Sequence, residues 1–368
     1  MTSGHRVVRA GLALAAFVLL LASATASAHV PRAFFGVNPQ SALQTADYQR
    51  MEKANVGTLR FELHWAAIDK APGGVYDWSD PDRIIGQAAA GGVRALPFAF
   101  ATPQWVAALD GHDCSAAPCG TFAPTGAGAM AAWRDFLAAA VRRYGPNGEF
   151  WQANPDIPAL PIRNWQLWNE QNSPSFYAPK PNVADYAELL HAGRRAITSE
   201  DAGAKIILGG MFGTPRGGQR PAIAAWDYLA KLYEKGAKPD FDGVAPHPYA
   251  PKLKSVKLQI KLMREAMSDA GDDDADLWIT EIGWASGGPD NPLNRGDEGQ
   301  ADRLTETFKY FVKKRKRLNI RNVDWYSWRD ESASGAGLCE WCPYSGLLRE
   351  DLTAKPSLKA FTKFTGGS

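Results

Sequence analysis

One stretch, Asn164–Asn172, is the best guide to the fold, and it reads Asn-Trp-Gln-Leu-Trp-Asn-Glu-Gln-Asn. It begins as a short apolar and aromatic run, which is typical of a buried strand, and ends abruptly in polar side chains. Asn169 and Glu170 therefore lie where a strand meets its loop, the position at which parallel α/β sheets place their chemistry. A second stretch of the same form, Asp276–Ser286, reads Asp-Leu-Trp-Ile-Thr-Glu-Ile-Gly-Trp-Ala-Ser, and Glu281 closes its apolar run.

Strand-like and helix-like segments alternate along the rest of the chain. The predicted strands are Ala33–Asn38, Gly57–Leu63, Val93–Phe100, Asn164–Glu170, Ala204–Gly209, Phe241–Pro246, Leu277–Glu281 and Val323–Trp328. The predicted helices are Thr45–Ala54, Pro81–Ala90, Ala129–Tyr144, Val183–Ser199, Ala222–Lys235, Leu253–Ala270, Gly299–Leu318 and Pro356–Phe364. Strands that alternate with helices imply a parallel sheet, and eight such units indicate an α/β fold of the closed (β/α)8 TIM-barrel type, in a single catalytic domain. The main rival is a doubly wound open sheet, which usually shows a glycine-rich phosphate turn, and none follows the first, fourth or fifth predicted strand.

The composition is that of an ordinary globular protein. Of 368 residues, 45% are hydrophobic and 22% are charged, and the net charge is +2. So small a charge predicts no broad attraction to nucleic acid or to a membrane surface. A mean hydropathy of −0.30 argues against an integral membrane protein.

The first 28 residues predict a secretory signal peptide. His5, Arg6 and Arg9 make a positive start, Ala10–Ala22 is a short apolar core, and Ala-Ser-Ala at 26–28 is a small-residue cleavage signal. The alternative is an uncleaved anchor helix, but the apolar core is too short to span a bilayer comfortably. We therefore expect a secreted protein, extracellular or associated with the cell wall. Its catalytic domain would be 29–368, with no stable membrane insertion after cleavage.

Four cysteines remain, Cys114, Cys119, Cys339 and Cys342. In an exported protein they predict disulfides, for which three pairings exist. We expect the two local pairs, Cys114–Cys119 and Cys339–Cys342. A four-thiolate zinc site is the alternative, which export disfavours because it favours oxidation.

The predicted strand ends bring a specific set of side chains to one rim of the barrel. Cleavage of a glycosidic bond by two carboxylates needs an ionised nucleophile and an acid that keeps its proton at neutral pH. Arg60, on the second strand, can hold one carboxylate ionised, and Tyr249 can donate a hydrogen bond to it. Trp328 offers an aromatic platform for the apolar face of a sugar.

These motifs resemble those of the large clan of retaining glycoside hydrolases with (β/α)8 barrels, clan A. The resemblance rests on Trp-Asn-Glu at 168–170 and on Trp-Ile-Thr-Glu-Ile-Gly-Trp at 278–284, together with Arg60, His247-Pro248-Tyr249 and Trp328. It covers nearly all of the chain after the signal peptide. Within the clan the chain is most similar to bacterial members of family 39, with family 5 next.

The resemblance implies a role for each of these residues. Glu170 would be the acid/base and Glu281 the nucleophile, with their carboxyl groups about 5–5.5 Å apart. The implied substrate-binding residues are Asn169 at the 2-hydroxyl of the reacting sugar, Arg60 and Tyr249 beside Glu281, His247 along the reacting subsite, and Trp328 as its floor. Three other tryptophans, Trp65, Trp105 and Trp284, are candidates for further sugar subsites, with ordinary packing under a loop as the alternative. We expect no metal and no cofactor.

Two departures from the clan pattern affect the expected activity. Gln171 follows Asn-Glu where many relatives have proline, which alters the rigidity of the loop. Xylosidases of family 39 usually carry an added β-rich module, for which this chain has little room. The sequence therefore favours an enzyme that cuts within a polysaccharide over an exo-acting xylosidase. The alternative function is a catalytically silent barrel that only binds carbohydrate, but both glutamates are present. The sugar, the linkage and the oligomeric state stay open.

Overall fold

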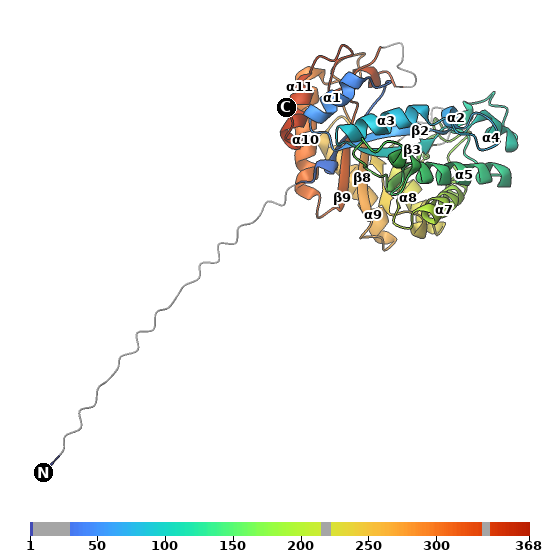
Figure 1. The fold of residues 1–368 in the computed structure, drawn as a ribbon. Helices are drawn as coiled ribbons and strands as arrows, with labels where there is room; N and C mark the ends of the chain where they lie inside the picture. Colours follow the sequence, from blue (N-terminus) through green and yellow to red (C-terminus); the bar gives the residue numbers. More distant parts are fainter. Residues whose placement is uncertain (3–29, 215–221, 333–338) are drawn as a thin grey trace. The chain divides into compact units, whose positions relative to one another are not determined.

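The computed structural model describes residues 1–2, 30–214, 222–332 and 339–368 (Figure 1). The predicted signal peptide lies outside the described residues, apart from its first two. The segment from Pro31 to Ser368 forms a compact unit of its own. No helix in the described part of the chain has both the length and the apolar character that crossing a membrane requires.

A closed sheet of parallel strands forms the centre of this unit. The strands are β1 (Phe35–Asn38), β2 (Thr58–His64), β3 (Arg94–Phe100), β4 (Asn164–Asn169), β5 (Lys205–Phe212), β6 (Gly243–Val244), β7 (Pro246–His247), β8 (Asp276–Ile282) and β9 (Ile320–Tyr326). The sheet order is β4-β3-β2-β1-β9-β8-β6-β5, and β4 also pairs with β5, which closes the ring. Because β6 and β7 both pair with β5, they are two pieces of one barrel strand. The predicted eight-stranded (β/α)8 barrel is confirmed.

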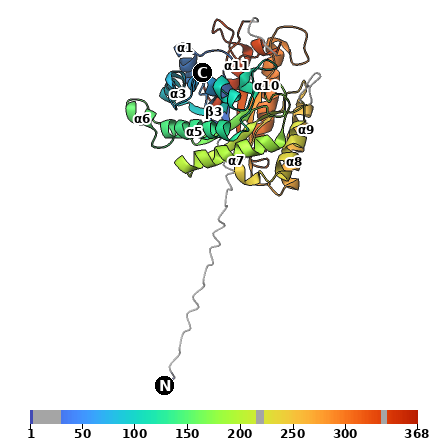
Figure 2. The same ribbon diagram turned by 90° about the vertical axis from the view of Figure 1, so that its right-hand side faces the viewer.

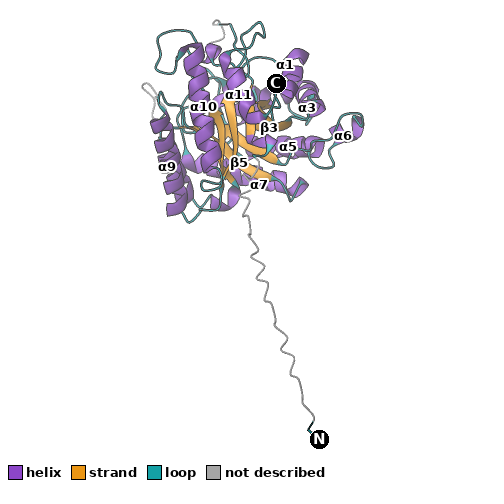
Figure 3. Ribbon diagram, turned by 90° about the vertical axis from the view of Figure 1, so that its left-hand side faces the viewer, coloured by secondary structure: helices purple, strands orange, loops and turns teal. Residues whose placement is uncertain are grey.

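Helices form an outer layer around the strands (Figures 2 and 3). They are α1 (Thr45–Lys53), α2 (Trp65–Ile68), α3 (Ser79–Ala90), α4 (Gln104–Leu109), α5 (Ala127–Tyr144), α6 (Glu149–Ala153), α7 (Val183–Glu200), α8 (Ala225–Glu234), α9 (Leu253–Asp269), α10 (Gly296–Lys314) and α11 (Pro356–Thr365). The helix α11 starts at a proline and stops at Gly366, whose φ of 75° suits a glycine that ends a helix. The chain then returns to α1, where the Ser368 N–H bonds to the Lys53 carbonyl at 2.9 Å.

The side chains on the two faces of β2 lie in different environments. In β2 the side chains of Leu59, Phe61 and Leu63 are at most 2% exposed and face the helices. Because side chains alternate along a strand, Arg60 and Glu62 point to the barrel interior instead. A charged residue on this inner face is therefore carried to the centre of the barrel by the same alternation that buries its apolar neighbours.

Both cysteine pairs are local disulfides. Cys114–Cys119 and Cys339–Cys342 have Cα–Cα distances of 5.0 and 5.4 Å, within the usual range for a disulfide. This is the predicted pairing. The four-thiolate zinc alternative is not formed, because each sulfur is already bonded to another.

Candidate active site

The strand β4 ends in a backbone conformation that turns two side chains toward the barrel mouth. Trp168 and Glu170 have φ of 76° and 43°, in the left-handed region that residues other than glycine rarely adopt. The Glu170 N–H donates to the Gly210 carbonyl at 2.7 Å, which ties this turn to β5. Such conformations cost roughly 1–3 kcal/mol each and persist only where the surrounding structure enforces them. As a result, Asn169 and Glu170 both line the same cavity.

Glu170 and Glu281 face each other across that cavity. A carboxylate oxygen of one lies within 4.8 Å of a carboxylate oxygen of the other. Their side chains are 11% and 12% exposed, so each is largely buried but still reachable. This upper bound on the distance between one oxygen of each group is compatible with the roughly 5–5.5 Å between the carboxyl groups of retaining glycosidases.

Arg60 is the hub of the hydrogen bonds beneath the two glutamates. Its Nη1 donates to Glu281 Oε1 at 2.8 Å and to Asn38 Oδ1 at 2.9 Å. Its Nη2 donates to Asn169 Oδ1 at 2.7 Å, and its Nε donates to Gln166 Oε1 at 2.6 Å. The guanidinium, 1% exposed, therefore uses its planar fork to fix residues from three other strands at once, β1, β4 and β8.

The two carboxyl groups differ in electrostatic environment. Burial raises the pKa of Glu170 well above its usual range, and the charge of Glu281 raises it further. Burial also raises the pKa of Glu281, but the Arg60 guanidinium opposes that rise, as does the Tyr249 hydroxyl, which donates to Glu281 Oε2 at 2.8 Å. Glu281 is therefore the easier of the pair to ionise, and Glu170 is the one that holds a proton.

His247 lies behind Glu170, fully buried, and does not line the cavity as the resemblance had implied. Its Nδ1 is 2.9 Å from Glu170 Oε1, and its Nε2 is 2.9 Å from Thr280 Oγ1. The Thr280 hydroxyl also accepts from Gln166 Nε2 at 3.3 Å. If the Thr280 hydroxyl donates to Nε2, then Nδ1 carries the imidazole proton and donates to Glu170. Each donor in this series of hydrogen bonds then has an acceptor.

The close approach of His247 depends on a glycine. A Cβ on Gly210 would lie 1.9 Å from His247 Nε2, so only glycine leaves room for the ring. Burial and the nearby Arg60 lower the pKa of His247 well below its usual range. The imidazole is therefore neutral and acts as a hydrogen-bonding group rather than as a cation.

The same residues could also be considered as a metal site. Ligand atoms of Glu170, His247 and Glu281 lie within 4.8 Å of one another. However, Arg60 Nη1 already bonds to Glu281 Oε1 at 2.8 Å, so a positive charge balances the site from the protein itself. A divalent cation would have to bind beside that guanidinium, which like-charge repulsion opposes. The donor set fits a carboxylate pair better than a metal centre.

The cavity at the carboxyl ends of the strands has a volume of about 800 Å³ and combines aromatic rings with polar side chains. Such a lining suits a ligand with apolar faces and many hydroxyl groups. The residues that line it are Asn38, Pro39, Gln40, Arg60, Phe61, Glu62, Phe98, Asn169, Glu170, Ser173, Ser175, Phe176, Phe212, Tyr249, Glu281, Asn291, Tyr326, Cys339, Glu340, Trp341 and Cys342.

One wall of this cavity is a cluster of packed aromatic rings. Tyr249 lies with its ring centroid 5.2 Å from that of Trp341 and 5.7 Å from that of Phe212. Tyr326, at the end of β9, is 6.2 Å from Trp341. Trp341 belongs to the short loop that the Cys339–Cys342 disulfide closes. Sequence reasoning missed Tyr326 and Trp341 as site residues.

The prediction that Trp328 forms the floor of the reacting subsite is wrong. Its ring is fully buried, and its indole N–H donates to Asp47 Oδ1 at 3.1 Å, away from the cavity. The reason is that β9 ends at Tyr326, two residues earlier than expected, so that Tyr326 is the last inward-facing side chain of the strand. The sequence signal was the alternation along this strand, which makes Tyr326 rather than its neighbour Trp325 face inward.

The other three candidate tryptophans are packing residues, the alternative kept open from the sequence. Trp65 and Trp284 are fully buried, and Trp105 is half-buried, and none of them lines the cavity. Trp65 donates to Asp69 Oδ2 at 3.0 Å, and Trp105 donates to the Asp69 carbonyl at 3.0 Å. Trp284 donates to the Ala250 carbonyl at 2.9 Å. Their indole N–H groups are used inside the protein, where burial requires a partner.

Gln171, which stands where many clan members have proline, is also directed inward. It is fully buried, and its Nε2 donates to the Gly209 carbonyl at 3.1 Å. This bond links the segment after β4 to β5. The turn is therefore held by a side-chain hydrogen bond, and Gln171 makes no contribution to the cavity lining.

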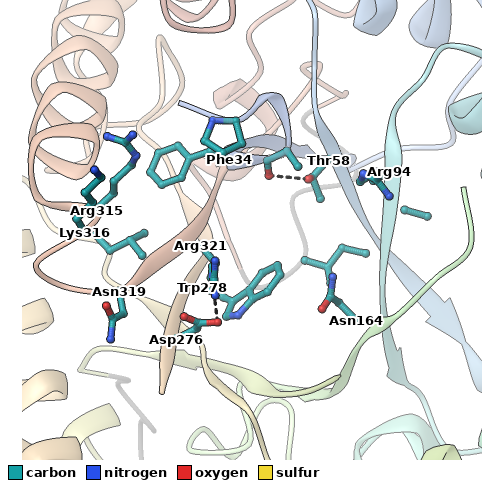
Figure 4. Close-up of a pocket in the computed structure, with 15 residues that line it drawn as sticks. Phe34, Thr58, Arg94, Asn164, Asp276, Trp278, Arg315, Lys316, Asn319 and Arg321 are labelled. Atoms are coloured by element: carbon teal, nitrogen blue, oxygen red, sulfur yellow. Dashed lines mark hydrogen bonds and ion pairs between the residues drawn. The ribbon is translucent and has the colours of Figure 1, made fainter. Parts of the chain in front are cut away.

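A second cavity, of about 540 Å³, opens at the opposite end of the barrel (Figure 4). It is lined by residues at the amino ends of the strands, including Thr58, Arg94 and Asn164, with Trp278 beside the Asp276–Arg321 ion pair. Chemistry in (β/α)8 barrels is located at the carboxyl ends of the strands, where Glu170 and Glu281 lie. The second cavity is therefore not the candidate active site.

The closed barrel has the fold of the clan A glycoside hydrolases. No family model matches the sequence, and no curated protein matches it either. The structural neighbours include glycoside hydrolases of families 39 and 5.

Three solved structures illustrate the likeness. A family 39 glycoside hydrolase from the gut symbiont Bacteroides cellulosilyticus WH2 has a TM-score of 0.67 at 20% identity, over 90% of this chain and 63% of that one. A monomeric β-xylosidase from Caulobacter crescentus CB15 has a TM-score of 0.61 at 19% identity, over 89% and 67%. A family 5 enzyme from Bifidobacterium longum, solved with Manβ1-4GlcNAc, has a TM-score of 0.64 at 16% identity, over 90% and 77%. At such identities the likeness establishes the fold, and this chain spans 63% of the length of the Bacteroides enzyme.

Proposed function

We propose that the protein is a retaining β-glycosidase that hydrolyses O-glycosidic bonds of a poly- or oligosaccharide by double displacement. The observation that carries the proposal is the pair Glu170 and Glu281, whose carboxylate oxygens approach within 4.8 Å and whose electrostatic environments differ. Glu281 bonds to Arg60 and Tyr249, which favour its ionised form. Glu170, the more strongly shifted group, keeps its proton.

In the first step Glu281 is the nucleophile. One of its carboxylate oxygens forms a bond to the anomeric carbon as the bond to the glycosidic oxygen breaks. Glu170 gives its proton to that oxygen, so the leaving group departs as a neutral alcohol. Asn169 accepts from Arg60 through its Oδ1, which leaves its amide nitrogen to donate to a hydroxyl of the reacting sugar.

In the second step the roles of Glu170 are reversed. Now a carboxylate, it takes a proton from a water molecule, whose oxygen attacks the anomeric carbon and releases Glu281. Two inversions restore the original anomeric configuration. The transfer returns the proton to Glu170, so the site is reset for the next substrate.

Export is part of the proposal. Two observations support export. Segment 1–28 resembles a signal peptide, and the protein has two disulfides, which are rare in reducing compartments. Amino-terminal sequencing of the protein recovered from the medium would reveal cleavage after Ala28. A mature protein that retains this segment would contradict the secretory assignment without affecting the catalytic one.

The decisive experiment follows hydrolysis of a panel of aryl β-glycosides and β-linked polysaccharides by proton NMR. We expect the first sugar product to have the β configuration. We also expect Glu281→Gln to lower the rate of hydrolysis at least about a thousandfold while substrate binding is kept. A chelator should leave the rate unchanged. Initial release of the α-anomer would contradict retention. Binding without any hydrolysis by the unaltered protein would instead favour a catalytically silent carbohydrate-binding barrel.

A further inference from the structure

The cavity carries two carboxylates besides the reacting pair, Glu62 and Glu340. Glu62 lies on β2, two residues after Arg60, so both side chains point to the barrel interior. Its side chain is 36% exposed, and its nearest ion-pair contact in the described part of the chain is His64 Nε2, 3.8 Å away. Glu340 is exposed and precedes Trp341 in the disulfide-closed loop. Both carboxylates are therefore available to a ligand.

The positive charge that lines the cavity is not available in this way. Among the described lining residues only Arg60 is cationic, and its guanidinium is 1% exposed. Each of its nitrogens already donates to a protein oxygen, including Glu281 Oε1 at 2.8 Å. A carboxylate on an incoming ligand would thus meet carboxylates of the protein and find no free cation among these residues to bind.

We propose that the cavity is built for a glycan without carboxylate groups, and that Glu62 is the residue that enforces this selection by accepting hydrogen bonds from the substrate. The inference rests on the proposed glycosidase function and specifies its substrate class. An ionised carboxylate is an acceptor only, so its partners must be donors, either hydroxyl groups or an ammonium group. Neutral sugars and amino sugars fit this chemistry, whereas uronic acids place a like charge in the site.

The test compares binding of matched β-linked oligosaccharides that contain neutral sugars, deacetylated amino sugars or uronic acids, displayed on one glycan array. The protein is the full mature chain with Glu170→Gln, because glutamine is neutral, like protonated Glu170, and leaves the charge of Glu281 in place. We expect neutral or amino-sugar chains to bind at least about tenfold more tightly than uronic chains of the same backbone. Glu62→Lys in this background should reduce that ratio at least about tenfold.

A matched control is Glu234→Lys, an exposed carboxylate at the end of α8 that does not line the cavity. It should leave the ratio unchanged. If Glu62→Gln weakens the binding of amino sugars selectively, the donor is an ammonium group. If it weakens the binding of neutral and amino sugars alike, the donors are hydroxyl groups. Either result supports the proposal.

Uronic chains that bind as tightly as neutral ones would overturn this inference while hydrolysis by the unaltered protein still supported the glycosidase assignment. The same holds if Glu62→Lys and Glu234→Lys give equal ratios. A protein that neither hydrolyses nor binds any glycan would overturn the proposed function, and this inference with it.

Discussion

The imidazole of His247 is hydrogen-bonded to the carboxyl group of Glu170, with Nδ1 2.9 Å from Oε1. The same ring nitrogen lies 3.5 Å from Glu281 Oε2. One neutral histidine therefore contacts both carboxyl groups of the proposed reaction, and the ring is held in place by Thr280 on its far side. The ionisation of the two glutamates is coupled through their charges, because the charge of Glu281 raises the pKa of Glu170.

The rate of hydrolysis should depend on pH as a bell. The proposed nucleophile Glu281 must be ionised, so activity appears as pH rises through its pKa, and Glu170 must be protonated, so activity is lost as pH rises through its pKa. Burial raises both values, which moves both limbs above those of a free glutamate. Measurement of kcat/KM against pH tests this. The alkaline limb should vanish in Glu170→Gln, and its survival there would contradict the assignment.

Replacement of Arg60 should affect both stability and the acid limb. Arg60→Met leaves the Glu281 charge buried without its partner, which should cost about 3–5 kcal/mol of unfolding free energy. Because Arg60 lowers the pKa of Glu281, its loss raises that pKa, and the acid limb should move to higher pH. Chemical denaturation and a pH profile measure the two effects. Arg60→Lys is the control that keeps the charge but loses the planar fork. An acid limb that does not move in Arg60→Met would contradict the role of Arg60 in lowering the pKa of Glu281.

Loss of the His247 contact should alter the alkaline limb. If Nδ1–H donates to Glu170 Oε1, it favours the ionised carboxylate, so its removal raises the pKa of Glu170. His247→Ala should therefore shift the alkaline limb to higher pH, whereas His247→Asn, which retains an N–H donor, should restore part of the difference. A shift to lower pH would show that Nδ1 accepts the proton of Glu170 instead.

Two tryptophans should separate binding from stability. Trp341→Ala removes a ring from the aromatic wall of the cavity and should raise KM roughly fivefold, the equivalent of about 1 kcal/mol. Trp328→Ala removes a fully buried ring and should instead cost about 3–5 kcal/mol of stability. Steady-state kinetics and thermal melting distinguish them. If Trp328→Phe, a milder change, raised KM without lowering Tm, Trp328 would belong to the subsite after all.

The barrel could be predicted because its signals are local. Each strand is a short apolar run, and each helix has its own periodic pattern, so the bounds of α7 and α9 differ from the prediction by one residue at most. The polar ends of β4 and β8 were visible for the same reason. Arg60 and Tyr249 were found because the predicted strands brought both to the rim that carries the glutamates, and the resemblance implied the same two residues.

The aromatic wall was less accessible to prediction. Trp325, Tyr326 and Trp328 lie within four positions. Alternation separates Tyr326 from Trp325, but sequence alone does not say whether β9 ends at Tyr326 or continues to Trp328. Trp341 lies in a loop after the last strand, and no local rule places such a loop over the cavity. Its position is decided by packing against Tyr249, whose ring centroid is 5.2 Å away.

The sequence by itself determined the order of the strands and of the main helices and the two glutamates at strand ends, because these follow from short-range pattern and spacing. It favoured the local disulfide pairs but left three pairings possible. Only the tertiary structure decided which side chains surround those glutamates. Arg60 reaches Glu281 across 221 positions of the chain, and burial of both gives each carboxyl group its own tendency to ionise. Burial and Coulomb interactions depend on neighbours in space, so the proposed division into acid and nucleophile rests on the folded barrel.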